Sequence, residues 1–347
     1  MLRCEMCGRV YPIVDGIPRM LPDSSEEFAE MMEGFGLPRN TRRANECHVK
    51  RFRQLHEATR QAFTFELRHY VSPGFEENCG FFETATGYNP RQLSGKTILD
   101  AGCGTGRFME VAASMGAYVV GIDLSRGVDR AYRETRFKSQ IDLIQGDLTN
   151  PPLRSESFDA LYSIGVLNHT PDTRQAFQSI SGLLRPGGRA AIWMDQRFLT
   201  ANGIHACHQL STRLSEGLSD GMRFFTTRMS HRMLHYACVG LAPLGELKRI
   251  AGSNRKLKAV FAPILLLPLS DHPNRKVRIR NTFMWFAPPN QWKHTTQEVL
   301  AWFEAEGYEA VHPLNRMAGV TGNKPLARNS MSPSPETLRS QHAYAGR

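Results

Sequence analysis

An apolar segment that ends in a glycine-rich turn limits the fold of this chain more than any other feature. It reads Ile98-Leu99-Asp100-Ala101-Gly102-Cys103-Gly104-Thr105-Gly106-Arg107-Phe108. The pattern predicts a buried strand, a turn with glycine at alternate positions and then a helix. Because glycine has no Cβ, a nucleotide-like ligand can lie directly on the backbone amides of such a turn. The turn is therefore the first candidate binding site.

A second apolar segment ends in an acid soon after the turn. It reads Val119-Val120-Gly121-Ile122-Asp123. An acid at the tip of a second strand can accept hydrogen bonds from both hydroxyls of a ribose. The dinucleotide fingerprint Gly-x-Gly-x-x-Gly would require glycine at position 107, where this chain has arginine. The spacing therefore disfavours an NAD-dependent enzyme.

Apolar and helical segments alternate between residues 94 and 196. We expect strands at 97–101, 118–123, 142–145, 160–164 and 189–194, and helices at 107–115, from near Ser125, and at 173–184. A helix at 299–306 and strands near 309–314 and 317–321 would complete the sheet. This alternation predicts an α/β fold with a Rossmann-like, doubly wound, mostly parallel sheet. Ligands of such sheets lie at the carboxyl ends of the strands.

The spacing Asp-x-Gly-x-Gly-x-Gly resembles motif I of the class I methyltransferases that depend on S-adenosylmethionine (SAM). Further segments follow in the order of that family, and they resemble its type 11 members. They are Gly146-Asp147-Leu148, the stretch from Ser163 to Asp172 with Val166-Leu167-Asn168-His169, and Leu183-Leu184-Arg185-Pro186-Gly187-Gly188. The resemblance covers residues 94–196 well and 281–322 more loosely.

The resemblance implies a SAM site at the ends of the strands. The implied cofactor-binding residues are Asp100, Gly102, Cys103, Gly104, Gly106, Asp123, Leu124, Asp147, Leu148 and Ser163. In this assignment the glycine turn receives the methionine part and Asp123 holds the ribose. Asp147 accepts from the adenine amino group, and Leu148 packs on the ring. Two roles stay open for Asp100, which either anchors the turn or accepts from the ammonium group.

Methyl transfer is an in-line displacement at an activated methyl group, so the enzyme mainly positions the acceptor and excludes water. A base that removes the acceptor's proton adds about 10²–10⁴-fold. His169 is the best-placed candidate for a catalytic base, and its alternative role is to cap the loop structurally. The second-rank candidates are His205, His208, His231, His235 and His294.

Two cysteines near the start are spaced like one zinc knuckle. Cys4 and Cys7 resemble the second half of a Trm112-like zinc ribbon, but the first half is absent. A structural zinc site needs about four ligands. Cys47, His48 or another chain would have to complete it, and the alternative is a metal-free remnant.

We expect six parts in the chain. They are a partial zinc-ribbon-like module (1–22), a helical N-terminal segment or lid (23–93), the SAM-binding core (94–196), a basic helical insertion that caps the acceptor pocket (197–292), a segment that completes the core sheet (293–323) and a disordered tail (324–347).

Basic residues gather in the insertion. Residues 197–293 hold fifteen Lys and Arg against four Asp and Glu, whereas the whole chain has a net charge of +10. Such a segment attracts anionic partners. We therefore expect an anionic small-molecule acceptor, methylated on oxygen or carbon. The simpler interpretation is a solvated helical face.

Other partners and functions follow from the same residues. The apolar stretch Phe261–Leu269 beside Lys256 and Lys258 could contact a membrane surface. An RNA methyltransferase is an alternative function, although no RNA-binding fold is recognisable and we do not expect nucleic acid as a partner. A SAM-binding regulatory or partner-docking module is a further alternative. Asn150-Pro151-Pro152 resembles a motif of enzymes that methylate amide or adenine nitrogens, but it follows the third strand instead of the fourth.

The location we expect is cytoplasmic. No apolar run approaches the roughly 18–20 residues that span a bilayer, and no signal-peptide pattern follows Met1. The seven cysteines are scattered and odd in number, which favours reduced thiols over a disulfide framework. The sequence leaves the oligomeric state open.

Overall fold

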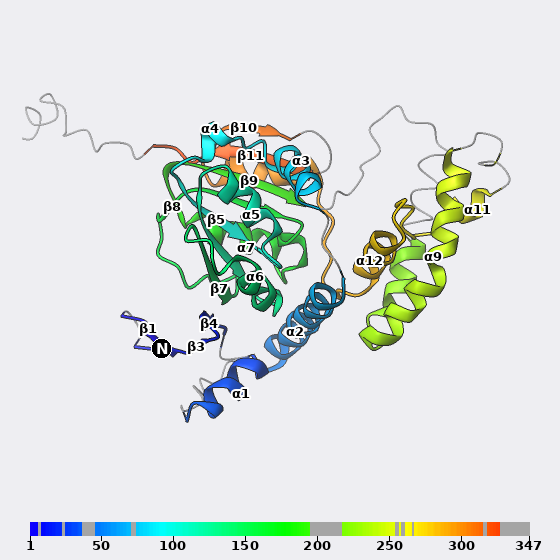
Figure 1. Ribbon diagram of the computed structural model, residues 1–347, viewed down its shortest axis with the longest axis horizontal. Coiled ribbons are helices and arrows are strands. Elements are labelled where there is room, and N and C mark those ends of the chain that lie inside the picture. Colours follow the sequence, from blue (N-terminus) through cyan, green and yellow to red (C-terminus); the bar gives the residue numbers. More distant parts are fainter. Residues whose placement is uncertain are drawn as a thin grey trace, which may run out of the picture.

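A large, mostly parallel sheet forms the centre of the computed structural model (Figure 1). The structure describes residues 1–5, 8–22, 25–36, 46–70, 74–194, 217–253, 257, 261–265, 267–314 and 318–326. Within these ranges nine strands pair in the order β10-β11-β9-β8-β5-β6-β7-β4-β3. The bounds are β3 Ile13–Val14, β4 Ile17–Met20, β5 Thr97–Ala101, β6 Tyr118–Asp123, β7 Ile141–Gly146, β8 Phe158–Ile164, β9 Leu184–Met194, β10 Glu309–Pro313 and β11 Ala318–Asn323.

Parallel pairing joins β4, β7, β6, β5, β8 and β9, and β11 lies antiparallel between β9 and β10. The predicted α/β fold with a Rossmann-like, mostly parallel sheet is confirmed. The largest difference in strand boundaries is at β9, which begins at Leu184 instead of residue 189, and the helix predicted at 173–184 ends at Ser181. Leu184 already pairs with Phe158, and the ladder is irregular before it resumes at the pair Ala160–Arg189. The Pro-Gly-Gly stretch thus lies within the strand as an irregularity instead of before it.

Helices cover both faces of the sheet. Their bounds are α3 Phe75–Thr86, α4 Pro90–Leu93, α5 Arg107–Ser114, α6 Gly127–Thr135, α7 Thr173–Ser181 and α13 Thr296–Ala305. Successive strand residues point to opposite faces. Ile98 therefore packs with Phe82 and Val111 in one core, and Leu99 packs with Phe177 in the other. Both cores are apolar, and this holds the carboxyl ends of the strands in a fixed arrangement.

The N-terminal residues do not form a module apart from the core. β1 (Leu2–Arg3) and β2 (Val10–Tyr11) pair with each other, but β4 adds to the main sheet as a parallel neighbour of β7. The predicted half site for zinc falls partly outside the described residues, which do not include Cys7 or the side chains of Cys47 and His48. Among the residues that are described, no group of three or more His, Cys, Asp or Glu could hold a metal ion.

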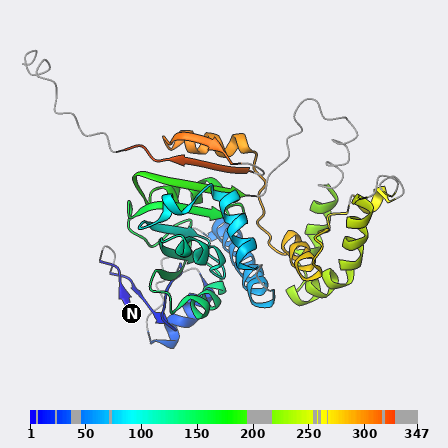
Figure 2. The same cartoon turned by 45° about the horizontal axis from the view of Figure 1, so that its top comes forward.

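The insertion is helical, as expected, and lies to one side of the sheet. Its elements are a helix at 217–226, α9 His231–Ser253, α11 Ala262–Leu265 and α12 Arg275–Phe286. Figures 1 and 2 show α2 (Glu46–His69) between the sheet and this group. Ala62 and Tyr70, in and just after α2, share a core with Leu234 of α9 and Phe283 of α12. No described helix is long and apolar enough to cross a membrane.

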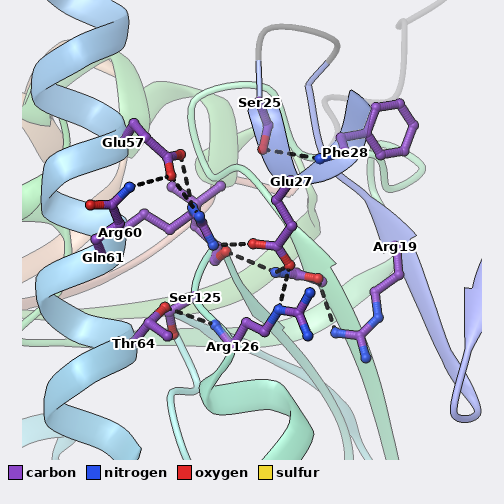
Figure 3. A network of polar contacts seen from close by, with 12 residues as sticks. Arg19, Ser25, Glu27, Phe28, Glu57, Arg60, Gln61, Thr64, Ser125 and Arg126 are labelled. Carbon is purple, nitrogen blue, oxygen red and sulfur yellow. Dashed lines mark hydrogen bonds and ion pairs between the residues drawn. The ribbon is translucent and has the colours of Figure 1, made fainter. Parts of the chain in front are cut away.

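A buried ionic network ties α2 to the core (Figure 3). Glu27 of α1 (Glu26–Gly34) accepts hydrogen bonds from Arg60 of α2, from Arg126 at 2.7 Å and from Gln145 of β7 at 3.3 Å. Arg19 of β4 donates to the same Gln145 at 2.9 Å. Because one carboxylate joins α2 to the start of α6 and to β7, α2 is fixed above the edge of the sheet where ligands are expected.

Candidate functional site

A cavity of about 320 Å³ lies at the carboxyl ends of the parallel strands. The glycine turn after β5 and the ends of β6, β7 and β8 form its floor. Further walls come from α2 and α3, which follow one another in the sequence, and from α12, which is distant from both. The cavity therefore lies between the sheet and the two helical additions.

Several predicted cofactor-binding residues line this cavity and several do not. Those that line it are Gly102, Cys103, Gly104, Asp123, Leu124, Asp147, Leu148 and the candidate base His169. Asp100, Gly106 and Ser163 are absent from the lining, although the turn and strand that carry them are correctly placed. The Ser163 hydroxyl donates to the carbonyl oxygen of Ala101 at 2.8 Å, which joins β8 to β5 beneath the turn.

The glycine turn has a backbone that other residues rarely adopt. Gly102, Gly104 and Gly106 have φ angles of +100°, +53° and +81°. A Cβ on Gly102 would lie 2.4 Å from a Cγ of Val166. A Cβ on Gly104 would meet no atom closer than 3.5 Å, so its positive φ is the constraint there. The turn can bend back towards β8 only because these positions lack a side chain.

Asp123 at the end of β6 holds the turn in place. Its Oδ2 accepts from the Gly104 amide at 2.9 Å, and its Oδ1 accepts from the Ser125 amide and hydroxyl at 2.8 and 2.6 Å. Burial raises the pKa of this carboxyl above its ordinary value, while these hydrogen bonds act in the opposite direction. A carboxylate has about four acceptor sites. One site on Oδ2 therefore stays open for a ligand hydroxyl.

Asp100 lies beneath the turn. Its side chain is 2% exposed, and its Oδ2 accepts from the Tyr162 hydroxyl at 2.9 Å. Burial raises the pKa of this carboxyl to about 8. A contact with a ligand's ammonium group is the less direct of its two expected roles, because the carboxyl does not line the cavity. Its contact with Tyr162 joins β5 to β8.

Asp147 and Leu148 follow β7, as the sequence predicts. Asp147 Oδ1 accepts from the amide and hydroxyl of Thr149, both at 2.9 Å. The other carboxylate oxygen lies 3.8 Å from Nδ1 of His56 on α2. Leu148 is 5% exposed and lies at the same end of the cavity. An acid and an apolar side chain are thus available at the position where an adenine ring would lie.

His169 is held firmly by its neighbours. Its Nδ1 lies 2.8 Å from the carbonyl oxygen of Asn290, so this nitrogen carries the proton and donates it. Its Nε2 is 3.3 Å from Nδ2 of Asn168, and its ring makes an edge contact with Phe63 of α2. An imidazole that is protonated on Nδ1 alone carries its lone pair on Nε2. The same contacts also hold the loop that carries His169, so they are compatible with both expected roles of this residue, catalytic base and structural cap of the loop.

The other candidate histidines lie elsewhere. His294 approaches the Thr173 hydroxyl at 3.1 Å, and Nδ1 of His235 lies 2.7 Å from the Tyr70 hydroxyl. Neither these two nor His231 is part of the cavity wall. His205 and His208 lie outside the described residues.

Two helices, in the segments expected to form a lid (23–93) and a cap (197–292), contribute cavity residues that were not among the predicted site residues. From α2 and its end come His56, Thr59, Arg60, Phe63, Glu66, Leu67 and Tyr70, and from α12 come Arg280, Asn281, Met284 and Trp285. The first set recurs at intervals of three and four residues, which places it on one face of a helix. That periodicity was present in the sequence. A search for apolar stripes does not find this helix face, because polar and apolar side chains are mixed on it.

An ion pair crosses the cavity wall between these two helices. Arg280 of α12 donates through Nε to Glu66 of α2, whose side chain is 2% exposed. Arg107, the first residue of α5, lies against the same cavity with its guanidinium 4.2 Å from the Phe108 ring centre. Burial and the neighbouring charge of Arg280 lower the pKa of Arg107 to about 10. Arg107 therefore remains charged at neutral pH.

Comparison with known proteins identifies part of the chain. A family model described as Methyltransferase domain matches residues 99–192, within the segment 94–196 that resembles the class I methyltransferases. The tRNA (carboxymethyluridine(34)-5-O)-methyltransferase ALKBH8 of Mus musculus is 29% identical over 186 residues, covering 50% of this chain and 27% of that protein. O-methyltransferase resE of Aspergillus sclerotiorum is 36% identical over 136 residues, covering 36% of this chain and 50% of that protein.

A solved structure is also similar in sequence over part of the chain. The crystal structure of an S-adenosylmethionine dependent methyltransferase from Mesorhizobium loti is 34% identical, covers 30% of this chain and 49% of that chain, and has a TM-score of 0.29. The chain thus spans between 27% and 50% of the length of these relatives.

Proposed function

We propose that this chain is a SAM-dependent methyltransferase that acts on a small molecule. One observation carries the proposal: a single cavity joins an open glycine turn to acids at the ends of the next two strands, Asp123 and Asp147. A donor with a sugar and a purine needs these groups in this order. They all lie within residues 99–192, the segment that matches the methyltransferase model.

The residues present fit such a donor. At Gly104 the glycine turn lines the cavity, and a Cβ there would contact the Leu67 side chain of α2 at 3.5 Å, so the missing side chain leaves room beside the backbone. The open acceptor site on Asp123 would take a ribose hydroxyl, and Asp147 with Leu148 would receive the adenine. Bound SAM supplies an activated methyl group on a sulfonium. The remaining chemistry is positioning and the exclusion of water.

In this proposal α2 and α12 exclude water, and His169 handles the proton. Nδ1 of His169 is fixed by the Asn290 carbonyl, so Nε2 is the nitrogen that can take a proton from an acceptor hydroxyl. The weak contact from Asn168 to Nε2 would be exchanged for the acceptor. The proton would then rest on Nε2 until the product leaves.

We infer O-methylation of a small molecule as the reaction, because the similar protein of Aspergillus sclerotiorum is named an O-methyltransferase. An RNA acceptor is the second candidate. It is favoured by the tRNA methyltransferase from mouse and by the basic insertion. Salt-sensitive binding of tRNA, weakening steeply between 50 and 200 mM salt, would support the RNA acceptor.

Calorimetry with S-adenosylhomocysteine tests the donor site. Wild-type protein should bind in the micromolar range, about −8 kcal/mol. Asp123→Asn should weaken binding by about 1–3 kcal/mol, because it removes charge-assisted hydrogen bonds to both the turn and the ribose. Asp142→Asn, an exposed acid on β7, is the matched control and should bind normally. Equal binding by the Asp123 variant and wild type would contradict the ribose assignment.

Transfer itself is tested with SAM that carries a radiolabelled methyl group. A panel of hydroxyl-bearing acids and total tRNA are offered as acceptors in separate reactions. Label in the organic acids supports the small-molecule acceptor, and label in tRNA alone would replace it with the second candidate. Donor binding without any transfer would leave a regulatory SAM-binding module as the better description.

A further inference from the structure

The guanidinium groups of Arg107 and Arg280 line the same cavity, and the carboxylate of Glu66 lines it as well. Arg280 pairs with the buried Glu66. Arg107 lies close enough to Arg280 for the two positive charges to repel each other, which contributes to the lowered pKa of Arg107. Among the described residues, no side chain forms a hydrogen bond or ion pair with the Arg107 guanidinium.

Arg107 is a guanidinium on the cavity wall with no described acid bonded to it. The acids whose charges act on it are Glu66, Asp100 and Glu77, and burial raises the pKa of Asp100 to about 8, so this carboxyl is protonated at neutral pH. Glu66 already pairs with Arg280. Bound SAM would add positive charge, since its sulfonium and ammonium outnumber its carboxylate. A guanidinium that lines a cavity without a hydrogen-bonded acid favours a negatively charged second ligand.

The wall beside the arginines is aromatic. Phe81 of α3 and Trp193 of β9 make an edge contact with ring centres 5.2 Å apart, and Phe81 also stacks on Phe108 at 5.9 Å. Trp285 of α12 closes the same region and is 37% exposed. Such rings bind a flat apolar skeleton. Guanidinium forks at the edge of this wall match a carboxylate or phosphate.

We propose that the methyl acceptor is an aryl anion whose carboxylate or phosphate is held by Arg107 together with Arg280, with its ring against the aromatic wall. This inference rests on the proposed function and deepens it by naming the acceptor class and its anchors. Arg107 is the main anchor, since Arg280 already donates to Glu66 through Nε. Its position at the first residue after the glycine turn places the acceptor beside the donor.

Direct binding tests the acceptor class without turnover. Benzoate, phenyl phosphate and neutral benzyl alcohol are titrated calorimetrically into the full chain saturated with S-adenosylhomocysteine. At least one of the two anions should bind, at least tenfold more tightly than benzyl alcohol, and the better one identifies the anionic group. Arg107→Met and Arg280→Met should each weaken that anion at least tenfold. Arg133→Met, an exposed arginine of α6, should bind it normally.

The donor's own carboxylate is the competing source of the anion. S-adenosylhomocysteine carries that carboxylate and 5′-methylthioadenosine lacks it. Our inference requires that Arg107→Met bind both nucleosides within about twofold of wild type, which also shows that the variant is folded. A tenfold loss for S-adenosylhomocysteine alone would place the donor's carboxylate on Arg107 and overturn the inference. Arg107→Lys keeps the charge and should bind the aryl anion with intermediate affinity.

The outcomes separate this inference from the function on which it rests. Absence of S-adenosylhomocysteine binding in wild type would refute the proposed function. Normal nucleoside binding combined with no aryl anion binding, or with equal anion binding in Arg107→Met and wild type, would refute only the acceptor assignment.

Discussion

Replacing Asp100 by asparagine should stabilise the protein, and increasingly so as the pH rises. The carboxyl is 2% exposed, and burial raises its pKa from 3.8 to about 8. Between these two values the folded chain keeps a proton on Asp100 that the unfolded chain has lost. Stability contributed by this group is therefore complete below about pH 4 and is lost progressively up to about pH 8.

The size of the effect follows from the shift. Each pKa unit corresponds to about 1.4 kcal/mol, so a shift of about four units costs about 5–6 kcal/mol above pH 8 and about 4 kcal/mol at pH 7. Asparagine has the size of a protonated aspartic acid, and its carbonyl oxygen can accept the hydrogen bond from Tyr162. Asp100→Asn therefore removes the penalty without removing the contact.

The pH dependence of the stability is measured by urea unfolding, followed by tryptophan fluorescence at pH 4.5, 6, 7.5 and 9. The free energy of unfolding of Asp100→Asn minus that of wild type should rise by about 5 kcal/mol across the series. Asp142→Asn, at an exposed position on β7, controls for loss of one negative charge and should give a nearly constant difference. A difference for Asp100→Asn that varies by less than about 1 kcal/mol over this range would refute the reasoning.

Two further variants test the turn and the position of α2. Gly102→Ala should lose about 3–5 kcal/mol of stability in urea unfolding, because its φ is +100° and its Cβ would lie 2.4 Å from Val166; a loss below about 1 kcal/mol would contradict the tight turn. Glu27→Gln should lower the free energy of unfolding by about 2 kcal/mol and weaken S-adenosylhomocysteine binding severalfold, because it weakens the link to Arg60 that holds α2 over the cavity. Unchanged stability and affinity would show that this network does not position α2.

Local sequence patterns sufficed for the central sheet. The predicted strands at 97–101 and 118–123 coincide with β5 and β6, because buried parallel strands read as short apolar runs and glycine marks the turn that follows. The boundary of β9 was missed because proline and glycine normally end an element. Here the pairing of Leu184 with Phe158 outweighed that local preference.

The residues of the candidate site also form two groups, those that the sequence placed correctly and those that only the structure could place. Asp123 and Asp147 could be placed from the sequence, because each directly follows a strand and the ends of parallel strands meet at one edge of the sheet. Asp100 and Ser163 also lie at strand ends, but their side chains point into the protein instead of into the cavity. Which side a strand residue faces depends on what packs on each face of the sheet.

The amino-acid sequence by itself determined the alternating strands and helices, the glycine turn and the acids that follow two strands, because each depends on residues within a few positions of one another. Only the tertiary structure decided which side chains of the expected lid and insertion line the cavity. Arg280 and Glu66 are 214 positions apart, and β4 pairs with β7 across more than a hundred residues. Such contacts depend on how whole helices and strands pack together, and no short sequence pattern encodes that packing.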